Sequence, residues 1–488
     1  MSSDLLDLID RWKSLTVLVI GDAMLDCYLT GSSDRLCREA PAPVVAIHQR
    51  QDIPGGAANT AANLISLGSK PLLLSVTGTD HEGDRLRTAL EQRGLSLAHL
   101  LQSDRATLAK QRIMAGSQVL VRLDQGSTEA IAGDLERTFI DQLIAQFPLC
   151  DAVIVSDYSY GVLTPRIIQV LADLQARFPR TVVIDSRRLE NYRTVGVTAV
   201  KPNYEEAIQL LGLPKQLQNR AEQIAPHGDR LLAITGAAIV AVTLDLEGAI
   251  IFEAGQPPLR TYARPVPQNQ TSGAGDTFIS ALTLALATGA STTTATNLAT
   301  SATAIVVQQP GTTACKAEEL CQAVIDATSR SKLILDQSDL ATYIQQYRAA
   351  GQRIVFTNGC FDILHPGHVT YLTQAKALGD VLIIGVNTDE SIRQLKGIGR
   401  PINPLSDRLI VLSALSCVDH VVPFAELTPK NLIRIVCPDI YVKGGDYTRE
   451  TLPEAELVEE LGGDVRILPY VDNRSTTRLI HQIRTLHV

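Results

Sequence analysis

The chain lacks the features that mark membrane proteins and nucleic-acid-binding proteins. Its longest nearly unbroken apolar run, 278–287, is of core-helix length and falls short of the roughly 18 residues that a membrane helix needs. Its 52 acidic residues outnumber 44 basic residues, which gives a net charge of -8. That balance gives no support for binding to nucleic acid or to a membrane surface. We expect small-molecule partners whose phosphates are held by glycine loops and single Arg or Lys side chains.

The chain also lacks any CxxC pair among its eight cysteines. This absence argues against a zinc ribbon and against a disulfide framework. Scattered reduced thiols favour a cytoplasmic protein. Residues 1–15 form an acidic amphipathic segment that does not have the pattern of a signal peptide.

No Walker A sequence is present, so the chain is not a P-loop kinase. Its 488 residues are too many for one ordinary core and predict two or three domains. A composition of 45% hydrophobic and 20% charged residues is typical of a soluble globular protein. Strand patterns alternate with helix patterns from residue 15 to residue 310, which predicts an α/β domain with a mostly parallel sheet.

A glycine turn at 272–277, Ser-Gly-Ala-Gly-Asp-Thr, leads into the apolar run 278–287. This pattern predicts a tight turn at the start of a buried helix. The unpaired N–H groups and the dipole of a helix N-terminus attract anions, and glycines let a ligand approach the backbone. Asp276 would suit a general base that takes a proton from a hydroxyl while residues 273–275 hold the phosphoryl group. The alternative is an ordinary helix cap.

Carboxylates follow several of the expected strands. The strand at 15–20 leads to Asp22 and Asp26, at the end of the strand where α/β folds place their sites. Either residue alone would also fit a solvated turn. Two later strands end in the same way, at Asp157 and at Asp185.

The segment 54–59, Pro-Gly-Gly-Ala-Ala-Asn, is a glycine pair that opens an Ala/Asn-rich helix. Small residues there permit close approach by a sugar, whose hydroxyls Asn59 could bind, although a Gly-Gly turn alone is weak evidence. Residues 111–123 alternate in polarity and include Arg122, which suits either a lid strand or a plain edge strand.

Together, the glycine turn and the segments 21–26, 39–44 and 54–59 resemble ribokinase-like sugar kinases, and in particular their heptose-phosphate kinases. The resemblance implies a β lid over the sugar, ATP as phosphoryl donor, Asp276 as the catalytic residue, and Mg²⁺ arranged indirectly by Glu206. The segment around Glu206 also fits a capping box. The ATP-binding residues that it implies are Asn203, Tyr204, Glu205, Glu206, Thr243, Gly248, Gly273, Ala274 and Gly275. The sugar-binding residues that it implies are Asp22, Asp26, Gly55, Gly56, Asn59, Arg122, Asp157, Asp185 and Arg187.

Four positions depart from that family's pattern. Gln270 stands where an aspartate usually precedes the glycine turn, and Tyr160 stands where lysine is often found. Arg187 replaces a phosphate-holding lysine, for which it can substitute electrostatically but with different geometry. Asp245 occupies a turn position that often holds glycine. Asp276 is retained, so these changes bear on sugar specificity and rate.

A second chemical centre follows the short strand 353–356. The segment 357–368 ends in His-Pro-Gly-His, with His365 and His368 at the start of a helix over 369–377. At a spacing of three residues both rings face the same way, and the helix N-terminus adds positive potential. The pair suits orientation and neutralisation of a nucleotide's α-phosphate without a covalent intermediate. A zinc site is the alternative, but no third ligand stands in a zinc-motif arrangement.

The segment 357–368, Thr-Asn-Gly-Cys-Phe-Asp-Ile-Leu-His-Pro-Gly-His, resembles the cytidylyltransferase-like nucleotidyltransferase superfamily. Its later cations would serve a triphosphate, although surface charge is the default interpretation. The segment 475–477 opens the last helix and fits either a phosphate-binding element or an N-cap. The nucleotide-binding residues expected in this region are Asn358, Gly359, Phe361, Asp362, Gly367, Lys396, Arg408, Lys443, Gly444, Asp446, Ser475, Thr476 and Thr477.

The order of the two regions resembles the bifunctional heptose kinase/adenylyltransferases. We expect a ribokinase-like domain at 1–328, a linker at 329–337 and a smaller Rossmann-like nucleotidyltransferase domain at 338–488. The resemblance implies phosphorylation of heptose 7-phosphate at C1 by ATP. It then implies transfer of AMP from ATP to heptose 1-phosphate with release of pyrophosphate, Mg²⁺ in both sites, and ADP-heptose as the product.

Two alternatives stay open at this point. One is a kinase and nucleotidyltransferase pair that acts on a different sugar phosphate or uses CTP, because the residues alone do not separate ATP from CTP. The other is a nucleotide-binding protein with a decayed kinase site, to which Gln270 and Tyr160 give slight support. We further expect a homodimer.

Overall fold

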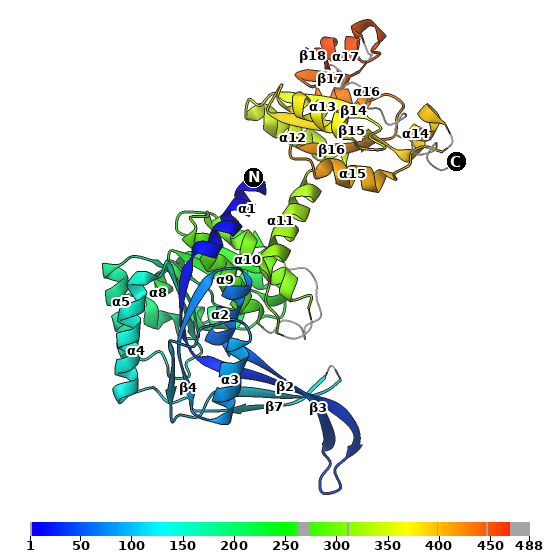
Figure 1. The fold of residues 1–488 in the computed structure, drawn as a ribbon. Coiled ribbons are helices and arrows are strands. Elements are labelled where there is room, and N and C mark those ends of the chain that lie inside the picture. Colours follow the sequence, from blue (N-terminus) through cyan, green and yellow to red (C-terminus); the bar gives the residue numbers. More distant parts are fainter. Residues whose placement is uncertain are drawn as a thin grey trace. The chain divides into compact units, whose positions relative to one another are not determined.

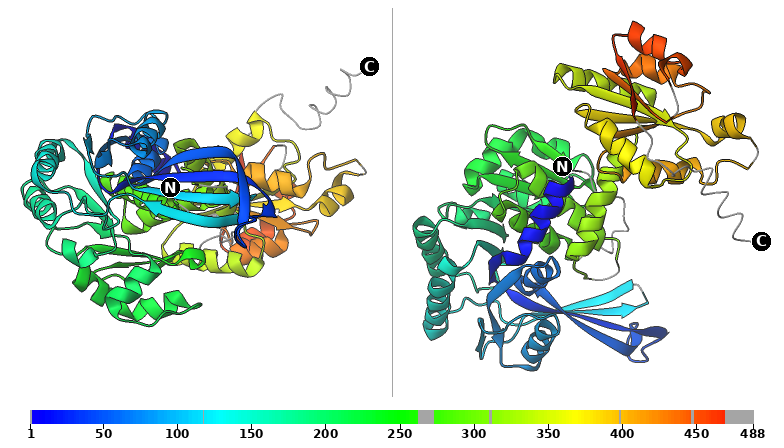
Figure 2. Two further views of the ribbon diagram at one scale, coloured as in Figure 1. Left: turned by 90° about the horizontal axis from the view of Figure 1, so that it is seen from below. Right: turned by 45° about the horizontal axis from the view of Figure 1, so that its top comes forward.

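The structure is a computed structural model, and it describes residues 2–116, 118–261, 273–309, 312–397, 399–445 and 448–468. The chain divides into two compact units, Met1–Val324 and Ile325–Val488. Figures 1 and 2 draw both units. None of the helices in the described ranges is both long and apolar enough to span a membrane.

A nine-stranded sheet forms the centre of the first unit. Its strands, in spatial order, are β13 (Leu259–Thr261), β12 (Ala249–Glu253), β11 (Ile239–Thr243), β10 (Ala199–Val200), β9 (Thr181–Ser186), β8 (Ala152–Asp157), β1 (Thr16–Gly21), β4 (Lys70–Gly78) and β5 (Leu100–Ser103). All neighbours are parallel except the two pairs that involve β12. The mostly parallel sheet expected from the sequence is therefore confirmed.

Helices cover both faces of this sheet, because side chains along each buried strand alternate between the faces. On β1, Val17 and Val19 belong to one buried cluster, whereas Leu18 and Ile20 belong to the other. Helices that contribute to the first cluster are α1 (Ser2–Arg11), α2 (Ala57–Ser66), α3 (His81–Glu91), α9 (Ala274–Ala287), α10 (Thr292–Val306) and α11 (Ala317–Ser331). Those of the second are α4 (Gly133–Gln146), α5 (Pro165–Arg177), α6 (Tyr204–Leu211), α7 (Arg220–Ile224) and α8 (Gly228–Thr235).

A second sheet of the first unit is the predicted lid, with strands β3 (Pro43–Gly56), β2 (Ala23–Leu36), β6 (Ala109–Ala115) and β7 (Gln118–Gln125) in that order. It projects from the end of the core sheet (Figure 1). Only Asp22 separates β1 from β2, so the chain passes directly from the core sheet into the lid. The alternating stretch 111–123 belongs to β6 and β7, which pair antiparallel.

The second unit is built on a five-stranded parallel sheet. Its strands, in spatial order, are β16 (His420–Phe424), β15 (Val381–Asn387), β14 (Ile354–Gly359), β17 (Ile440–Gly444) and β18 (Asp464–Leu468). The helices of this unit are α12 (Gln337–Ala349), α13 (Pro366–Lys376), α14 (Asp389–Lys396), α15 (Leu405–Ser413), α16 (Lys430–Val436) and α17 (Ala455–Glu460). Strand order reverses at β14, which pairs with both β15 and β17, and α/β sheets bind ligands in the crevice at that point.

The expected linker at 329–337 is partly helical. Helix α11 continues through Ser331, so residues 329–331 are helical. The reason lies in the sequence, because neither Gly nor Pro occurs between Lys316 and Ser331 to end the helix.

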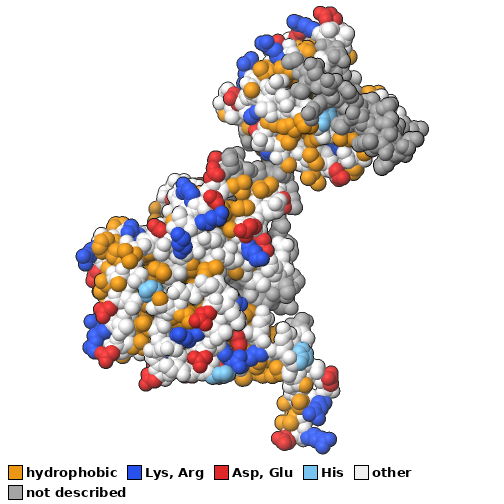
Figure 3. Space-filling model, viewed as in Figure 1, with side chains coloured by type: hydrophobic (Ala, Val, Ile, Leu, Met, Phe, Trp, Pro, Cys, Tyr) orange, Lys and Arg blue, Asp and Glu red, His pale blue; other side chains and the backbone are white. Residues whose placement is uncertain are grey.

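Basic and acidic side chains are interspersed over the visible face of the first unit (Figure 3). No broad area of one charge sign is visible among the described residues of that face.

Candidate active sites

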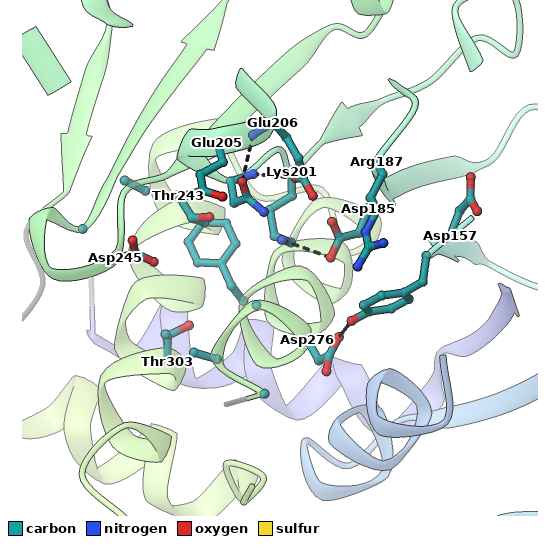
Figure 4. A pocket seen from close by; sticks show the side chains of 18 of the residues that line it. Asp157, Asp185, Arg187, Lys201, Glu205, Glu206, Thr243, Asp245, Asp276 and Thr303 are labelled. Carbon is teal, nitrogen blue, oxygen red and sulfur yellow. Dashed lines mark hydrogen bonds and ion pairs between the residues drawn. The ribbon is translucent and has the colours of Figure 1, made fainter. Parts of the chain in front are cut away.

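A cavity of about 970 Å³ opens in the first unit at the carboxyl ends of β8, β9 and β10. Figure 4 shows that its labelled side chains come from strands and helices far apart in the sequence. Predicted residues that line this cavity are Asp157, Asp185, Arg187, Asn203, Glu205, Glu206, Thr243, Gly248, Gly273, Ala274, Gly275 and Asp276.

Asp276 lies in the first turn of α9 at the base of this cavity, with its side chain buried. Its Oδ2 accepts a hydrogen bond from Asn59 Nδ2 over 2.6 Å, and its Oδ1 accepts weaker ones from Thr60 and from the Tyr158 hydroxyl, the latter over 3.5 Å. Burial raises the pKa of Asp276 to about 6, while the hydrogen bond from Asn59 acts in the opposite direction. The carboxylate is thus ionised at neutral pH and close to the range in which a base is effective.

The glycine turn before Asp276 adopts the conformation that its sequence predicts. Gly273 has φ of 83°, a left-handed conformation that glycine adopts without strain. A Cβ on Gly275 would lie 3.3 Å from Lys201 Nζ, so the glycine lets this cation reach the helix N-terminus. Ser272 and Gln270 lie outside the described residues.

Lys201 is a residue of this cavity that the sequence analysis did not select. It follows β10 directly, is 5% exposed, and pairs with Asp185 across 3.0 Å between Nζ and Oδ2. Burial lowers the pKa of Lys201. The charges of Asp185 and Glu206 outweigh this effect, so the pKa is raised overall. The sequence could have indicated Lys201 by its position just past a buried strand, which is the feature that indicated Asp157 and Asp185.

Asn203 and Glu206 form the capping box of α6. Asn203 Oδ1 accepts from the Glu206 N–H over 2.9 Å, and Glu206 Oε2 accepts from the Asn203 N–H over 2.8 Å. Both residues also line the cavity, so the capping role leaves them placed for ligand contact. Burial raises the pKa of Glu206, and the nearby charge of Asp185 adds to this effect.

The nucleotide side of the cavity contains a turn in which Asp245 replaces glycine. Asp245 has φ of 53°, in the left-handed region that favours glycine, and it pairs with Arg220 across 2.7 Å. Thr243 and Gly248 flank this turn on the cavity wall. Tyr204, in contrast, is buried in the core, where its hydroxyl donates to Gln223 and accepts from the Gln216 N–H. Its side chain does not line the cavity, and a role in ATP binding stays a prediction.

The predicted contact between Asp22 and the sugar needs correction, because the Asp22 side chain is fully buried. Its carboxylate accepts hydrogen bonds from the backbone N–H groups of Tyr158, Tyr160 and Val162. Burial raises its pKa to about 6. Asp22 therefore holds the loop after β8 in place and is not available to a sugar.

The glycine pair makes room for protein atoms. A Cβ on Gly55 would lie 2.6 Å from Asp26 Oδ2, and a Cβ on Gly56 would lie 2.4 Å from the Asp22 carbonyl oxygen. Asp26 is itself paired with Arg112 across 2.7 Å. The packing thus explains both glycines, and Asn59 on the following helix binds Asp276.

Three other predicted sugar residues differ in their surroundings. Asp157 accepts hydrogen bonds from Ser186, Tyr192 and the Ser159 N–H, which occupies both of its oxygens at the cavity edge. Arg187 is exposed in the cavity, while Arg122 on β7 is paired with Asp124 on the same strand.

A second cavity, of about 610 Å³, lies in the second unit at the carboxyl ends of β14 and β17. Predicted residues that line it are Asn358, Gly359, Phe361, Asp362, His365, Gly367, His368, Lys396, Lys443 and Gly444. Asp446, Ser475, Thr476 and Thr477 lie outside the described residues.

The two histidines stack at the N-terminus of α13, with ring centroids 4.0 Å apart. His365 is the N-cap residue and His368 lies in the first turn. Burial lowers the pKa of His368 to about 4, and the neighbouring His365 and Lys396 act in the same direction. His368 is therefore a neutral imidazole at physiological pH, which can still donate one hydrogen bond.

Lys443 lies at the end of β17 and is half-buried beside Asn358, to whose carbonyl oxygen it donates over 3.2 Å. Burial lowers the pKa of Lys443 to about 8, against the opposing charge of Glu454. A phosphate in this cavity would restore its charge, because an anion favours the protonated form.

Asp362 and Arg408 both bind other parts of the protein. Asp362 accepts hydrogen bonds from Arg400 and from the N–H groups of Ile402 and Asn403, with a side chain that is 1% exposed. Arg408 is equally buried. It donates to three backbone carbonyl oxygens and pairs with Asp389. These residues position the loops around the cavity and do not present free charges to a triphosphate.

The described residues contain no group of three or more His, Cys, Asp and Glu side chains placed to hold a metal ion.

Comparison with known proteins gives one family for each unit and one for the whole chain. Residues 14–319 match the pfkB family of carbohydrate kinases, and residues 356–479 match the cytidylyltransferase-like family. The bifunctional protein HldE of Pseudomonas aeruginosa (strain UCBPP-PA14) is 40% identical over 97% of this chain and 98% of its own length. HldE of Desulfatibacillum aliphaticivorans is 37% identical over 98% of this chain and 97% of its own length.

The chain belongs to the HldE family. This agrees with the expected order of a sugar kinase followed by a nucleotidyltransferase. Among solved structures, phosphofructokinase-2 from Escherichia coli aligns with a TM-score of 0.53 at 19% identity, covering 64% of this chain and 97% of that one. Arabidopsis thaliana ribokinase aligns with a TM-score of 0.50 at 18% identity, covering 64% and 98%. These structures show the ribokinase-like fold of the first unit.

Proposed function

We propose that this member of the HldE family makes ADP-heptose in two steps. The first unit phosphorylates C1 of heptose 7-phosphate with ATP, and the second unit transfers AMP from ATP to heptose 1-phosphate with release of pyrophosphate. A separate phosphatase removes the 7-phosphate between the two steps. The observation that carries the kinase step is the buried Asp276 carboxylate at the N-terminus of α9.

In the kinase step, Asp276 takes the proton of the anomeric hydroxyl while the oxygen attacks the γ-phosphorus of ATP. The N–H groups at 273–275 face the developing negative charge, as the N-terminus of a helix does for bound anions. Lys201 is buried beside this turn and adds a fixed positive charge. Thr243 and Gly248 form the nucleotide side of the same cavity.

Mg²⁺ fits the residues of this cavity. Glu206 and Asp185 offer carboxylate oxygens on the cavity wall, and Mg²⁺ commonly takes one or two carboxylates together with substrate phosphates and water. When bound with ATP, Mg²⁺ neutralises charge on the transferred phosphoryl group.

In the nucleotidyl-transfer step, the sugar 1-phosphate attacks the α-phosphorus of ATP in line with the pyrophosphate. His365 and His368 hold the α-phosphate, His368 as a neutral hydrogen-bond donor. Lys396 and Lys443 line the same cavity and neutralise the leaving pyrophosphate. The protein positions and neutralises the reacting groups, so no covalent enzyme intermediate is needed.

We assign the kinase domain to residues 1–328 and the nucleotidyltransferase domain to 338–488. A cytoplasmic location suits the use of ATP, and the eight free cysteines suit a reducing compartment.

We assign a homodimer formed through the lid. Val121 and Leu123 share one face of β7 and are 45% and 48% exposed, while Val119 lies beyond the register shift between β6 and β7. Exposed apolar side chains grouped on one face are typical of a protein contact. Val121→Asp should convert a dimer to a monomer in sedimentation velocity, whereas monomeric wild-type protein would disprove this assignment.

The test of the function is the mass of the products. The protein is incubated with heptose 7-phosphate, a phosphatase specific for the 7-phosphate, and either ATP or CTP. We expect heptose 1,7-bisphosphate before phosphatase addition and ADP-heptose after it, with ATP only. A CDP-sugar, or no bisphosphate with any heptose phosphate, would contradict the proposed function.

A further inference from the structure

Two tyrosines and two cations form a cluster beside the kinase cavity. The rings of Tyr158 and Tyr160 stack with their centroids 6.2 Å apart. Lys110 Nζ lies 5.1 Å and 5.5 Å from the two centroids. The Arg187 guanidinium carbon lies 6.0 Å and 5.5 Å from the same centroids. Both positive charges therefore lie near one pair of aromatic rings.

The cluster joins the lid to the core sheet. Lys110 is on β6 of the lid, Tyr158 and Tyr160 are on the loop after β8, and Arg187 follows β9. Asp22 holds the loop that carries Tyr158 and Tyr160, because its carboxylate accepts hydrogen bonds from the backbone N–H groups of both tyrosines. The backbone of this loop is thus held in place, and the lid brings one of the two cations to its rings.

Neither cation forms an ion pair with a carboxylate within the described part of the chain, although carboxylates are close. Asp26 lies opposite Lys110 on β2 but is paired with Arg112. Asp124 lies opposite Lys110 on β7 but is paired with Arg122. For Arg187, the adjacent Asp185 is paired with Lys201. Asp26, Asp124 and Asp185 thus each have another cationic partner, so they leave Lys110 and Arg187 able to bind an anion.

Tyr158 fixes the place of this cluster relative to the reacting atoms. Its hydroxyl points to Asp276 Oδ1 over 3.5 Å, while Lys110 and Arg187 lie beside its ring. A sugar whose C1 hydroxyl contacts Asp276 and which lies along this side chain would present its far end to the two cations. Figure 4 shows Arg187 and Asp276 on the wall of the same cavity.

We infer that Lys110 and Arg187, set against the stacked rings of Tyr158 and Tyr160, bind the phosphate at the far end of the sugar and so select a phosphorylated sugar. This inference rests on the proposed kinase function and names the residues that determine its substrate. Because Lys110 comes from the lid and Arg187 from the core, a phosphate held between them also keeps the lid closed. The resembled kinases often have lysine at the position of Tyr160. In this chain the Tyr160 ring packs beside Lys110 and Arg187, which supply the positive charge.

The test compares two sugars and four proteins. Kinase kcat and KM are measured for heptose 7-phosphate and for heptose, with wild-type protein, Lys110→Met, Arg187→Gln, and the control Arg35→Gln, which removes an exposed lid cation on β2 away from the cluster. Loss of a charge-assisted hydrogen bond should raise KM for the phosphorylated sugar about tenfold or more, with little change in kcat. For heptose, each cluster variant should equal the wild type within about twofold, because the lost interaction is not made. Lys110→Arg should retain most of the affinity.

Equal losses on both sugars would mean that the cluster only supports the fold of the lid, and no loss on either sugar would mean that the phosphate binds elsewhere; both results overturn the inference. They leave the proposed function intact, because wild-type turnover of heptose 7-phosphate is measured in the same experiment. Absence of that wild-type turnover would remove the proposed function and this inference together.

Discussion

Asn59 donates a hydrogen bond to Asp276 over 2.6 Å, across 217 residues of sequence. Their contact joins the N-terminal part of α2 to the first turn of α9 and fixes one oxygen of the proposed base. Because the bond favours the charged carboxylate, it offsets part of the burial that raises the pKa of Asp276 to about 6. Asn59 thereby contributes, after burial, to the pH range in which Asp276 can accept a proton.

Asn59→Leu removes this hydrogen bond and should raise the pKa of Asp276 further. In wild-type protein the kinase kcat/KM should fall as the pH drops through about 6, because protonated Asp276 cannot act as a base. In the variant the fall should begin at higher pH. The measurement is the pH profile of kcat/KM for phosphoryl transfer. Nucleotidyl transfer by the same protein is the internal control, and an unchanged kinase profile would show that Asn59 does not tune the base.

Lys201→Met should lower both the kinase rate and the stability of the first unit. Removal of the cation leaves the half-buried Asp185 without its partner, and breaking a buried pair in this way costs up to about 3–5 kcal/mol. Denaturant unfolding measures the loss. The double variant Lys201→Met/Asp185→Asn should recover stability but not activity, because the positive charge beside the glycine turn is still missing. Recovery of full kinase activity would show that Lys201 serves the fold alone.

Binding of ATP to the second unit should be accompanied by proton uptake at pH 8. The pKa of Lys443 is about 8, so about half of these side chains are neutral at that pH in the free protein, and bound phosphate favours the charged form. Isothermal titration calorimetry in two buffers with different ionisation enthalpies measures the uptake, with the Asp276→Asn protein used to prevent turnover in the kinase site.

Two controls sharpen this test of Lys443. Uptake should disappear at pH 6, where the lysine is already protonated before ATP binds, and it should also disappear in Lys443→Met. Equal heats in both buffers at pH 8 would show that Lys443 does not meet the phosphates.

The sequence predicts the parts of the sites that depend on local pattern. The glycine turn before Asp276 and the two histidines around Gly367 can be recognised because a tight turn and a helix start are both encoded within a few residues. Buried strands that end in carboxylates likewise predict a parallel sheet and the edge at which its ligands bind.

The roles of individual charged residues could not be predicted in this way, because they depend on partners distant in the sequence. Asp22 matches a sugar-binding motif but is buried under the loop after β8, which no local pattern reveals. Arg408 looks like a phosphate-binding cation, yet its partners at Cys360 and Asn387 lie at the ends of two strands, β14 and β15. Lys201 gains its role only when β9 and β10 become neighbours and bring Asp185 to it.

The central claim is that two independent sites carry out successive transfers on one sugar. The most direct measurement assays both half-reactions in two variants, Asp276→Asn and His368→Ala. Asp276→Asn should lose kinase turnover by a factor on the order of 10²–10⁴ and keep nucleotidyl transfer, since a general base contributes about that much. His368→Ala should do the reverse. Loss of both activities in either variant would contradict the account.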